Sequence, residues 1–394
     1  MPNDNKQGLI NVIFWGCIFF TFSYYTFAKL GSGIMPSDFP QHTQAAQQLI
    51  DNGLLSFLKT DSYPLWQILV ALSSILLRMP LITSATFICS LLNTVTYILL
   101  YHFFIQHGLK INFLPSLLCA LLIMGPMYIP WFNPTIYLGQ GTPNIWHNPT
   151  TICVRPFALA TFILINNILK KDTKSQNNNT RDIIALAILL IFCNLAKPSF
   201  SQGIIPGLGL YIIIKLIYHK GKNLFYYLKI VAAFIPSVLL LVIQWFVSFY
   251  DNPSIAGENN GIAISLFEIL KLYSPNVLIS FILGMAFPIY ISLCNWNRII
   301  KKSDLQLLGC CMVASYLENA LLVETGVRKV HGNFGWAWLL FMFLAYVFAM
   351  REFLIWNESY DYKKTISKIA ISIGWGLFFI QAAIGIYYTF HLFS

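Results

Sequence analysis

Long apolar runs recur along this chain, and they restrict its possible folds more than any other feature does. The first run, residues 9–28, holds twenty residues and no charged side chain. About 20 apolar residues are needed for a helix to cross the hydrocarbon core of a bilayer. The sequence therefore predicts an all-α polytopic membrane helical bundle with about 11 transmembrane helices. The further runs lie near residues 83–104, 112–128, 151–169, 183–196, 203–218, 227–247, 273–293, 306–322, 335–350 and 368–391.

The composition agrees with a chain that is embedded in a membrane along its whole length. Of its 394 residues, 57% are hydrophobic and only 10% are charged, whereas soluble proteins carry roughly 25% charged residues. The net charge of +10 does not indicate a nucleic-acid partner, because most cations fall in connectors on one predicted side of the membrane. We expect residues 1–394 to form a single integral membrane domain that contacts membrane lipid and no nucleic acid.

The positions of Lys and Arg predict the orientation of the helices, because basic connectors usually face the cytoplasm. The apolar run 65–77 has thirteen residues, too few to cross, and a crossing there would move the basic connector 170–181 to the outer side. We therefore predict a helix within the outer leaflet at 65–77, an inner N-terminus and an outer C-terminus. The expected location is the cytoplasmic (inner) membrane, and the Asn, Lys and Ile content suggests a bacterial genome rich in AT.

The outer loop 29–82 carries an acid and a histidine soon after the first span. Asp38 and His42 are four residues apart and would share one face of a helix. Residues 41–58 have apolar positions at helical spacing, which predicts a helix lying on the membrane surface. Asp38 can cap that helix by accepting hydrogen bonds from its first amides. Alternatively, its carboxylate can remove a proton from an acceptor hydroxyl as that oxygen attacks a sugar.

The outer loop 129–150 is rich in Pro, Gly, aromatic and amide residues, which argues against a helix. Trp131 and Trp146 can stack on the apolar faces of a sugar ring, while Asn144 and His147 can pair with its hydroxyls. An aromatic belt at the membrane interface would account for the tryptophans. It would not account for the density of Asn, Gln, Gly and Pro, so we predict a loop that binds a ligand.

The outer loop 324–336 concentrates charge in a chain that has little of it. Glu324, His331 and Asn333 are predicted substrate contacts. The alternative is a salt-bridged cap between two spans. Arginine suits bidentate binding of a phosphate, and lysine supplies a point charge. The outer-side cations are therefore predicted to bind a donor phosphate, and they are Arg155, Lys197, Arg328 and Lys329.

The order of these features resembles the GT-C superfamily of membrane glycosyltransferases, which use polyprenyl-phosphate sugars. The resemblance rests on SDFPQHTQAAQQLIDNGLL, on YPLWQILVALSSILLR and on the Lys-Pro-Ser-Phe turn that begins at Lys197. It covers residues 1–220, with the outer loops 29–82 and 129–150. Residues 221–394 would add further transmembrane helices and the outer loop 324–336. The resemblance implies a catalytic acid in the first outer loop, which corresponds to Asp38.

Two departures from the superfamily bear on cofactors. Many members have a second acid beside the first, but here Phe39 follows Asp38, and the loop 129–150 contains no acid. The eight cysteines show no metal-ligand spacing. We therefore expect no cofactor; a divalent metal ion is possible, but no acid pair supports one.

Together these features predict an inverting glycosyltransferase at the outer face of the cytoplasmic membrane. Its donor would be a polyprenyl-phosphate sugar, and its acceptor a cell-envelope glycan or a lipid-linked saccharide. Asp38 would be the general base, with His42 among the substrate contacts. A polymerase of lipid-linked repeat units is the first alternative. A glycolipid transporter or flippase is the second; the sequence indicates neither the internal repeats nor the interrupted helices typical of transporters.

Overall fold

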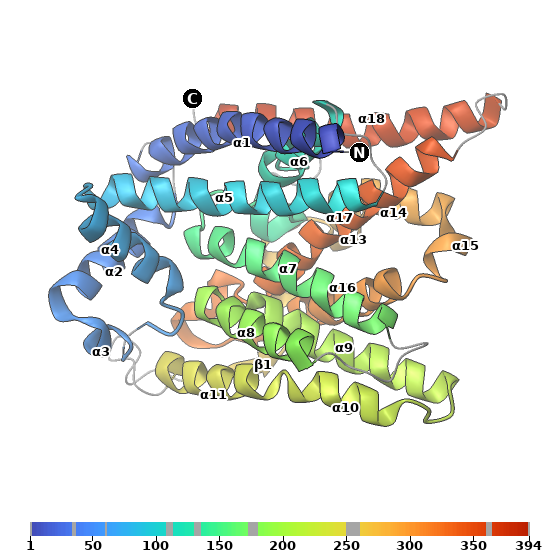
Figure 1. The fold of residues 1–394 in the computed structure, drawn as a ribbon. Helices are drawn as coiled ribbons and strands as arrows, with labels where there is room; N and C mark the ends of the chain where they lie inside the picture. The colour runs from blue at the N-terminus through green and yellow to red at the C-terminus, as the bar shows by residue number, and fades with distance from the viewer. Residues whose placement is uncertain are drawn as a thin grey trace.

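The computed structural model describes residues 2–33, 37–59, 61–107, 113–129, 135–171, 180–249, 261–359 and 365–392. Helices dominate these residues, and most of the long ones run along one common direction (Figure 1). The all-α prediction is confirmed, apart from a short antiparallel ribbon of β1 (Ile262–Ile264) and β2 (Leu322–Glu324) that pairs Ala263 with Val323.

Each predicted apolar run coincides with a helix or a pair of helices. The helices that coincide with these runs are α1 (Pro2–Gly31), α5 (Leu81–Gln106), α6 (Phe113–Met124), α7 (Pro149–Lys171), α8 (Thr180–Ala196), α9 (Ser199–Tyr218), α10 (Leu224–Ala232), α11 (Ile235–Phe249), α13 (Val277–Gly284), α14 (Ala286–Cys294), α16 (Ser303–Leu321), α17 (Gly335–Glu358) and α18 (Thr365–Leu392). The other helices are α2 (Phe39–Asn52), α3 (Leu54–Phe57), α4 (Leu65–Leu77), the π-helix η2 (Ile136–Gln140), α12 (Glu268–Tyr273), α15 (Trp296–Ile299) and the 3₁₀-helix η3 (Gly326–His331).

The number of membrane spans is lower than the sequence suggested. Within the described residues, six helices are long and apolar enough to cross a bilayer, or up to eight if each of two bent pairs counts as one span. The predicted count of about 11 is therefore not confirmed. The three runs that fall short are α6, α8 and α16. At twelve residues, α6 rises only about 18 Å, and α16 carries Asp304 and Glu318.

Two bent helix pairs correct the expectation of uninterrupted helices. The helices α10 and α11 meet at 44°, and α13 and α14 meet at 69°. Proline cannot donate a backbone hydrogen bond, and its ring clashes with the carbonyl four residues earlier. Pro288 stands four residues after Gly284, whose carbonyl instead accepts a 2.7 Å hydrogen bond from the Tyr346 hydroxyl. The break in α13–α14 is thus stabilised from α17.

Within residues 29–82 the helix bounds agree in part with the prediction. The helix α4 has the predicted bounds and ends at Arg78, whose φ of 52° is left-handed. Where one surface helix was expected over 41–58, the structure has α2 and α3, because Gly53 adopts a φ of 77° between them. Ala46 and Leu49 face the protein from α2, and α4 packs against both α2 and α5.

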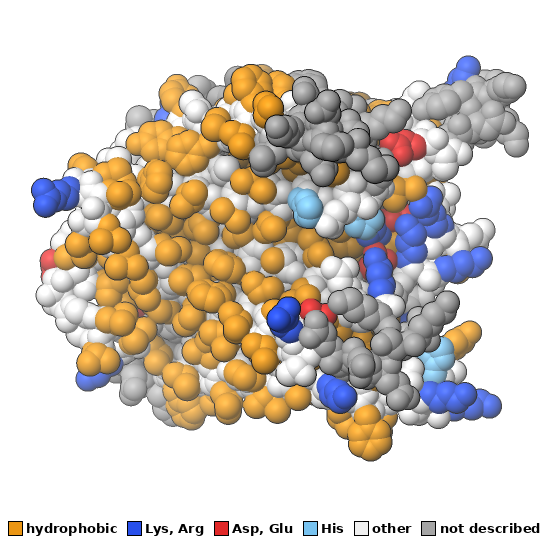
Figure 2. Space-filling view, viewed as in Figure 1, with side chains coloured by type: hydrophobic (Ala, Val, Ile, Leu, Met, Phe, Trp, Pro, Cys, Tyr) orange, Lys and Arg blue, Asp and Glu red, His pale blue; other side chains and the backbone are white. Residues whose placement is uncertain are grey.

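The two ends of the bundle differ in charge. Apolar side chains cover its middle, and most of the Lys and Arg side chains in view gather at the right-hand end (Figure 2). There the buried Arg351 donates to Asp304 at 2.7 Å, and Glu352 pairs with Lys302 at 2.6 Å. The helices α2, α3 and α4 occupy the left-hand end (Figure 1).

Candidate functional site

Asp38 stands at the start of α2, where its side chain makes no capping hydrogen bond. Its backbone amide donates to the His147 carbonyl at 2.9 Å, and its carboxylate accepts from the Asn148 side-chain amide at 2.6 Å. The capping alternative is therefore wrong for the side chain. The carboxylate is instead aligned by the loop that precedes α7, which joins the first and second outer loops.

Asn148 connects three segments of the chain through one amide. Its side-chain nitrogen donates to Asp38. Its side-chain oxygen accepts from the Lys197 ammonium at 3.0 Å and from the Thr151 backbone amide at 2.9 Å. The hydroxyls of Thr150 and Thr151 also donate to this oxygen, each at 2.8 Å. So many donors fix the amide orientation, and with it the position of the Asp38 carboxylate.

Lys197 lies in the turn between α8 and α9. The next residue, Pro198, immediately precedes the first turn of α9. Its ammonium donates to Asn148 and to the Thr151 hydroxyl, and it lies 3.5 Å from the centre of the Trp336 ring. Burial lowers the pKa of Lys197 to about 7, although the nearby Asp38 carboxylate favours the charged form. The site thus holds a cation that titrates near neutral pH.

Both predicted histidines of the first two outer loops join this site as neutral groups. Removal from water lowers the pKa of His42 and of His147 to about 4. His42 hydrogen-bonds to Gln67 at 3.2 Å, and the His147 ring lies 6.1 Å from the ring of Trp336. At neutral pH they can therefore orient a polar ligand without adding charge.

Asp61, a third acid of residues 29–82 after Asp38 and Asp51, was not singled out from the sequence. The Asp61 carboxylate accepts from Gln67 at 3.0 Å, so Gln67 connects it to His42. Burial raises the pKa of Asp61 to about 6. Its position just before the proline that opens α4 was a usable signal, since an acid beside a membrane segment is costly unless paired.

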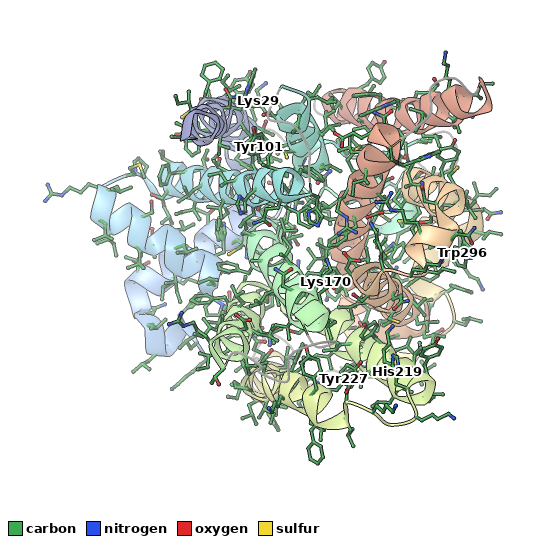
Figure 3. All side chains as sticks on the ribbon, turned by 45° about the vertical axis from the view of Figure 1, so that its right-hand side comes forward. Lys29, Tyr101, Lys170, His219, Tyr227 and Trp296 are labelled. Carbon is green, nitrogen blue, oxygen red and sulfur yellow. The ribbon has the colours of Figure 1, made fainter. Side chains whose placement is uncertain are left out.

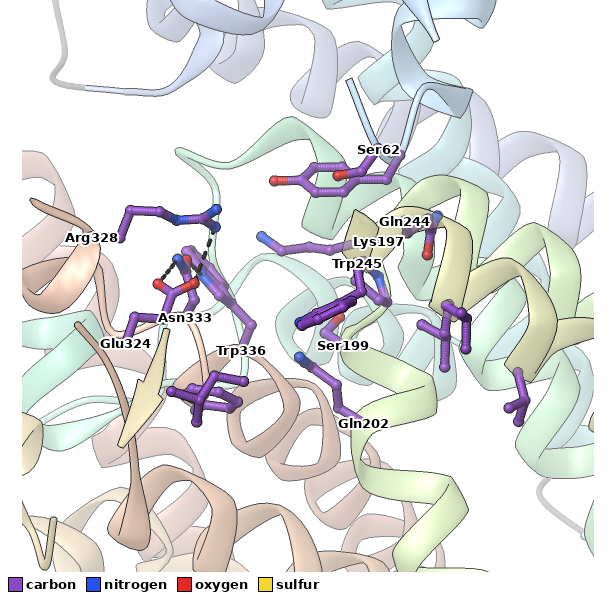
Figure 4. A pocket seen from close by; sticks show the side chains of 17 residues that line it. Ser62, Lys197, Ser199, Gln202, Gln244, Trp245, Glu324, Arg328, Asn333 and Trp336 are labelled. Carbon is purple, nitrogen blue, oxygen red and sulfur yellow. Dashed lines mark hydrogen bonds and ion pairs between the residues drawn. The ribbon is translucent and has the colours of Figure 1, made fainter. Parts of the chain in front are cut away.

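Residues 324–336 contain the ion pair that the alternative interpretation, a salt-bridged cap, predicted. Arg328 pairs with Glu324 at 3.2 Å, Asn333 donates to the Glu324 carboxylate, and the Trp336 indole donates to Asn333 at 3.3 Å. These side chains form one wall of a pocket, with Arg328 and Lys197 extending toward the same space (Figure 4).

This pocket has a volume of about 400 Å³, and its walls differ in chemistry. Polar groups come from the segments before α4, at the start of α9 and around η3, and apolar groups come from α11. The lining residues are Ser62, Tyr63, Lys197, Pro198, Ser199, Gln202, Val238, Leu241, Val242, Gln244, Trp245, Ile262, Glu324, Arg328, Asn333, Phe334 and Trp336.

Tyr63 lines the pocket, and it lies close enough to Asp38 for the charge of that carboxylate to affect its pKa. Burial raises the pKa of Tyr63 to about 12, and four nearby charges also act on its hydroxyl, namely those of Asp61, Arg328, Glu324 and Asp38. Asp38 does not line the pocket itself. It borders the pocket through Asn148 and Lys197, at hydrogen-bonding distances.

Two buried polar atoms of the pocket lack a hydrogen-bond partner within the part of the chain that the structure describes. They are the Ser199 hydroxyl and the side-chain oxygen of Gln244. An unpaired buried polar group costs about 1–3 kcal/mol, so both are suited to pair with a bound molecule. Ser199 belongs to the Lys-Pro-Ser-Phe turn that begins at Lys197, whereas Gln244 lies in no motif that would have marked it in the sequence.

Several predicted site residues lie apart from the pocket. The buried Arg155 guanidinium donates to the carbonyls of Ile123 at 3.0 Å and Pro143 at 3.5 Å. The Asn144 amide donates to the Gly125 carbonyl. Three more do not line the pocket: Trp146 is buried, Lys329 pairs with Glu268, and His331 is exposed. Trp131 lies outside the described residues.

The described residues contain no group of three or more His, Cys, Asp or Glu side chains that could hold a metal ion. Searches against protein-family models, curated proteins and solved structures found no match to this chain.

Proposed function

We propose that this protein is a membrane glycosyltransferase of the GT-C type. It would move a sugar from a polyprenyl-phosphate donor to a cell-envelope glycan or a lipid-linked acceptor. The observation that carries the proposal is the position of Asp38. Its carboxylate does not cap α2 but is aligned by Asn148 beside Lys197, at the border of a pocket with cationic, polar and apolar walls.

The three walls match the three parts of such a donor. Lys197 and Arg328 would bind the phosphate, together with the free amides of the first turn of α9. Ser199 and Gln244 would pair with sugar hydroxyls. The polyprenyl tail would lie against α11, whose Val242 and Trp245 line the pocket while remaining 47% and 43% exposed.

The reaction would be a single displacement with inversion at the anomeric carbon. The acceptor oxygen forms a bond to that carbon, the bond from the carbon to the phosphate oxygen breaks, and Asp38 takes the acceptor proton. The phosphate leaves with the electron pair of that bond, as an anion that needs no proton. The nearby cations would stabilise that charge. His42 and His147, neutral at pH 7, would orient the acceptor or the sugar.

The proposed location is the cytoplasmic membrane of a bacterium, with the Asp38 end outside, the N-terminus inside and the C-terminus outside. The few cations at the Asp38 end and the many at the opposite end support this orientation (Figure 2). A polymerase of lipid-linked repeat units would use the same site and would differ in product length.

A glycolipid transporter is the second candidate function, because the bent pairs α10–α11 and α13–α14 are of the kind found in transporters. Such a protein would move a lipid-linked sugar without forming a glycosidic bond. Its substrate could occupy the same pocket, but the alignment of Asp38 would then have no chemical purpose.

The Asp38→Asn variant tests the proposal. We expect it to lower sugar transfer by about 100- to 10,000-fold, the usual contribution of a general base. Purified full-length protein in vesicles would be assayed with a panel of radiolabelled polyprenyl-phosphate sugars and with acceptor glycolipids extracted from a bacterial envelope. Asp51→Asn is the matched control, since Asp51 is exposed on the same helix and accepts from Gln47.

Wild-type transfer by Asp38→Asn would refute the assigned base. Movement of labelled lipid across the vesicle without a new glycosidic bond would refute the transferase and favour the transporter. Products that grow by whole repeat units would identify the polymerase.

A further inference from the structure

A second site lies at the basic end of the bundle, between α9 and α16. The pocket there has a volume of about 710 Å³. Its α9 side presents Tyr211, Ile214, Lys215 and Tyr218, and its α16 side presents Gly309 among others. Nothing in the proposed transfer reaction uses these residues.

An apolar pocket of about 500 Å³ adjoins it on the other side of α16. The two pockets share four lining residues, Ile300, Gln306, Gly309 and Val313, so both border the N-terminal half of α16, and together we call them the groove. Trp296 of α15 lines its far part. Figure 3, in which this end is turned forward, shows Trp296 and His219, the residue after α9, on this same end of the molecule.

The charge of the groove is positive at the α9 side. Lys215 and Lys301 line the first pocket, and no acidic side chain of the described residues lines it. The one acid of the second pocket, Glu352, already pairs with Lys302 at 2.6 Å and with Arg298 at 3.2 Å. The two lysines therefore face the groove without a compensating carboxylate in its lining.

Gln306 adds a hydrogen-bonding group where the two pockets meet. Its side-chain nitrogen donates to the Ile300 carbonyl, and its buried oxygen has no hydrogen-bond partner among the described residues. An acceptor of this kind suits a hydroxyl donor. The groove therefore suits a ligand with three features. Its two cations fit an anionic headgroup, the Gln306 oxygen fits a hydroxyl group, and the apolar walls fit a long hydrocarbon chain.

We propose that this groove binds an anionic glycerophospholipid of the phosphatidylglycerol type. The phosphate lies between Lys215 and Lys301, a headgroup hydroxyl reaches Gln306, and the acyl chains occupy the apolar walls on both sides of Gly309. Basic pockets between transmembrane helices bind anionic headgroups in this way. Tyr211 and Tyr218 suit the headgroup level, where tyrosine is enriched.

This lipid site is separate from the proposed transfer site. Ser199 lines the transfer pocket, and Lys215 stands sixteen residues later on the same helix. Sixteen residues of α-helix rise about 24 Å. Failure of the transferase proposal therefore leaves the lipid proposal intact, and the reverse also holds.

The test is the affinity of the purified full-length protein for phosphatidylglycerol and phosphatidylcholine, titrated separately and followed by native mass spectrometry. We expect clear preference for phosphatidylglycerol in the wild type. The double variant Lys215→Gln, Lys301→Gln should weaken phosphatidylglycerol binding by about 30-fold, because each cation near a lipid phosphate is worth about 1 kcal/mol. Binding of phosphatidylcholine should change little.

Two further variants separate the groove from general surface charge. Lys220→Asn with Lys222→Gln removes the same charge from exposed positions that do not line the groove, and it should retain wild-type affinity. Gly309→Leu should weaken phosphatidylglycerol binding by filling the groove, since a side chain there meets nothing within 4 Å. Free glycerol phosphate at millimolar concentration should not compete.

Three results would overturn the proposal. They are unchanged affinity in the Lys215, Lys301 variant, an equal loss in the surface control, or unchanged affinity in Gly309→Leu. Full competition by glycerol phosphate would show a phosphate site that does not need the hydrocarbon chain, and it would also refute the lipid.

Discussion

At the scale of single residues, Lys197 is the most informative group. Its ammonium is buried, yet it keeps two hydrogen bonds and a contact with the face of Trp336. Such contacts hold a cation in place without neutralising it. With a pKa of about 7, the Lys197 side chain is charged in some molecules and neutral in others at the pH of a living cell.

This titration predicts a pH dependence for donor binding. A bound phosphate favours the charged ammonium, so affinity should be constant below pH 7. It should fall by up to about tenfold per pH unit above pH 7, where the free site loses its proton. Lys197→Arg should remove the fall, because the guanidinium stays charged. Donor dissociation constants measured from pH 6 to pH 9 in both proteins would check this, and an equal slope in the variant would contradict it.

The sequence indicated part of the candidate site and missed the rest. Asp38, His42 and His147 were recognisable because charged or titratable residues are rare at the ends of apolar runs. Gln244 was not, since an ordinary glutamine becomes notable only when packing buries it without a partner among the described residues. Ser199 was marked only as a member of the Lys-Pro-Ser-Phe turn. Arg155 looked like a phosphate ligand, but its neighbours in space are backbone carbonyls far along the chain.

At the scale of helices, the contact between α9 and α16 depends on a glycine. A Cβ atom at Gly207 would lie 2.5 Å from the Cα atom of Cys311, closer than atoms can pack. The helices α9 and α16 can therefore approach this closely only because position 207 has no side chain. At Gly209 a Cβ atom would meet nothing within 4 Å.

These two glycines give a matched pair of variants. Gly207→Leu should destabilise the protein by about 1–3 kcal/mol, the usual cost of overpacking. Gly209→Leu should cause no loss, because its side chain points into open space. Melting temperatures of the purified protein in one detergent would compare them. Equal melting temperatures for the two variants would mean that α9 and α16 are not closely packed.

Helix positions could be predicted from the sequence more readily than helix breaks. Apolar runs marked the helices because hydrophobic length is a local property. Proline alone did not mark the breaks. A proline follows each of them, Pro236 in α11 and Pro288 in α14, but Pro156 and Pro206 lie inside the unbroken helices α7 and α9. At the sharper break the Gly284 carbonyl has a partner on another helix, the Tyr346 hydroxyl.

At the scale of the whole molecule, the unequal charge of the two ends predicts their orientation. In a cysteine-free background, Gln48→Cys should react with a membrane-impermeant thiol reagent on intact cells. Lys222→Cys should react only after lysis. Both positions are exposed, Gln48 on α2 and Lys222 after α9. Labelling of both on intact cells would place the two ends on one side and refute the predicted topology.

The central position of α17 has a consequence for how the chain is made. Its residues from Gly335 to Leu354 are almost all buried, and it contacts helices as early in the chain as α5, where Phe103 packs against Phe348. A ribosome delivers this segment only after the sixteen α-helices that the structure describes before it. The earlier helices therefore lack their central packing partner while they are made, and the core of the protein is completed late in synthesis.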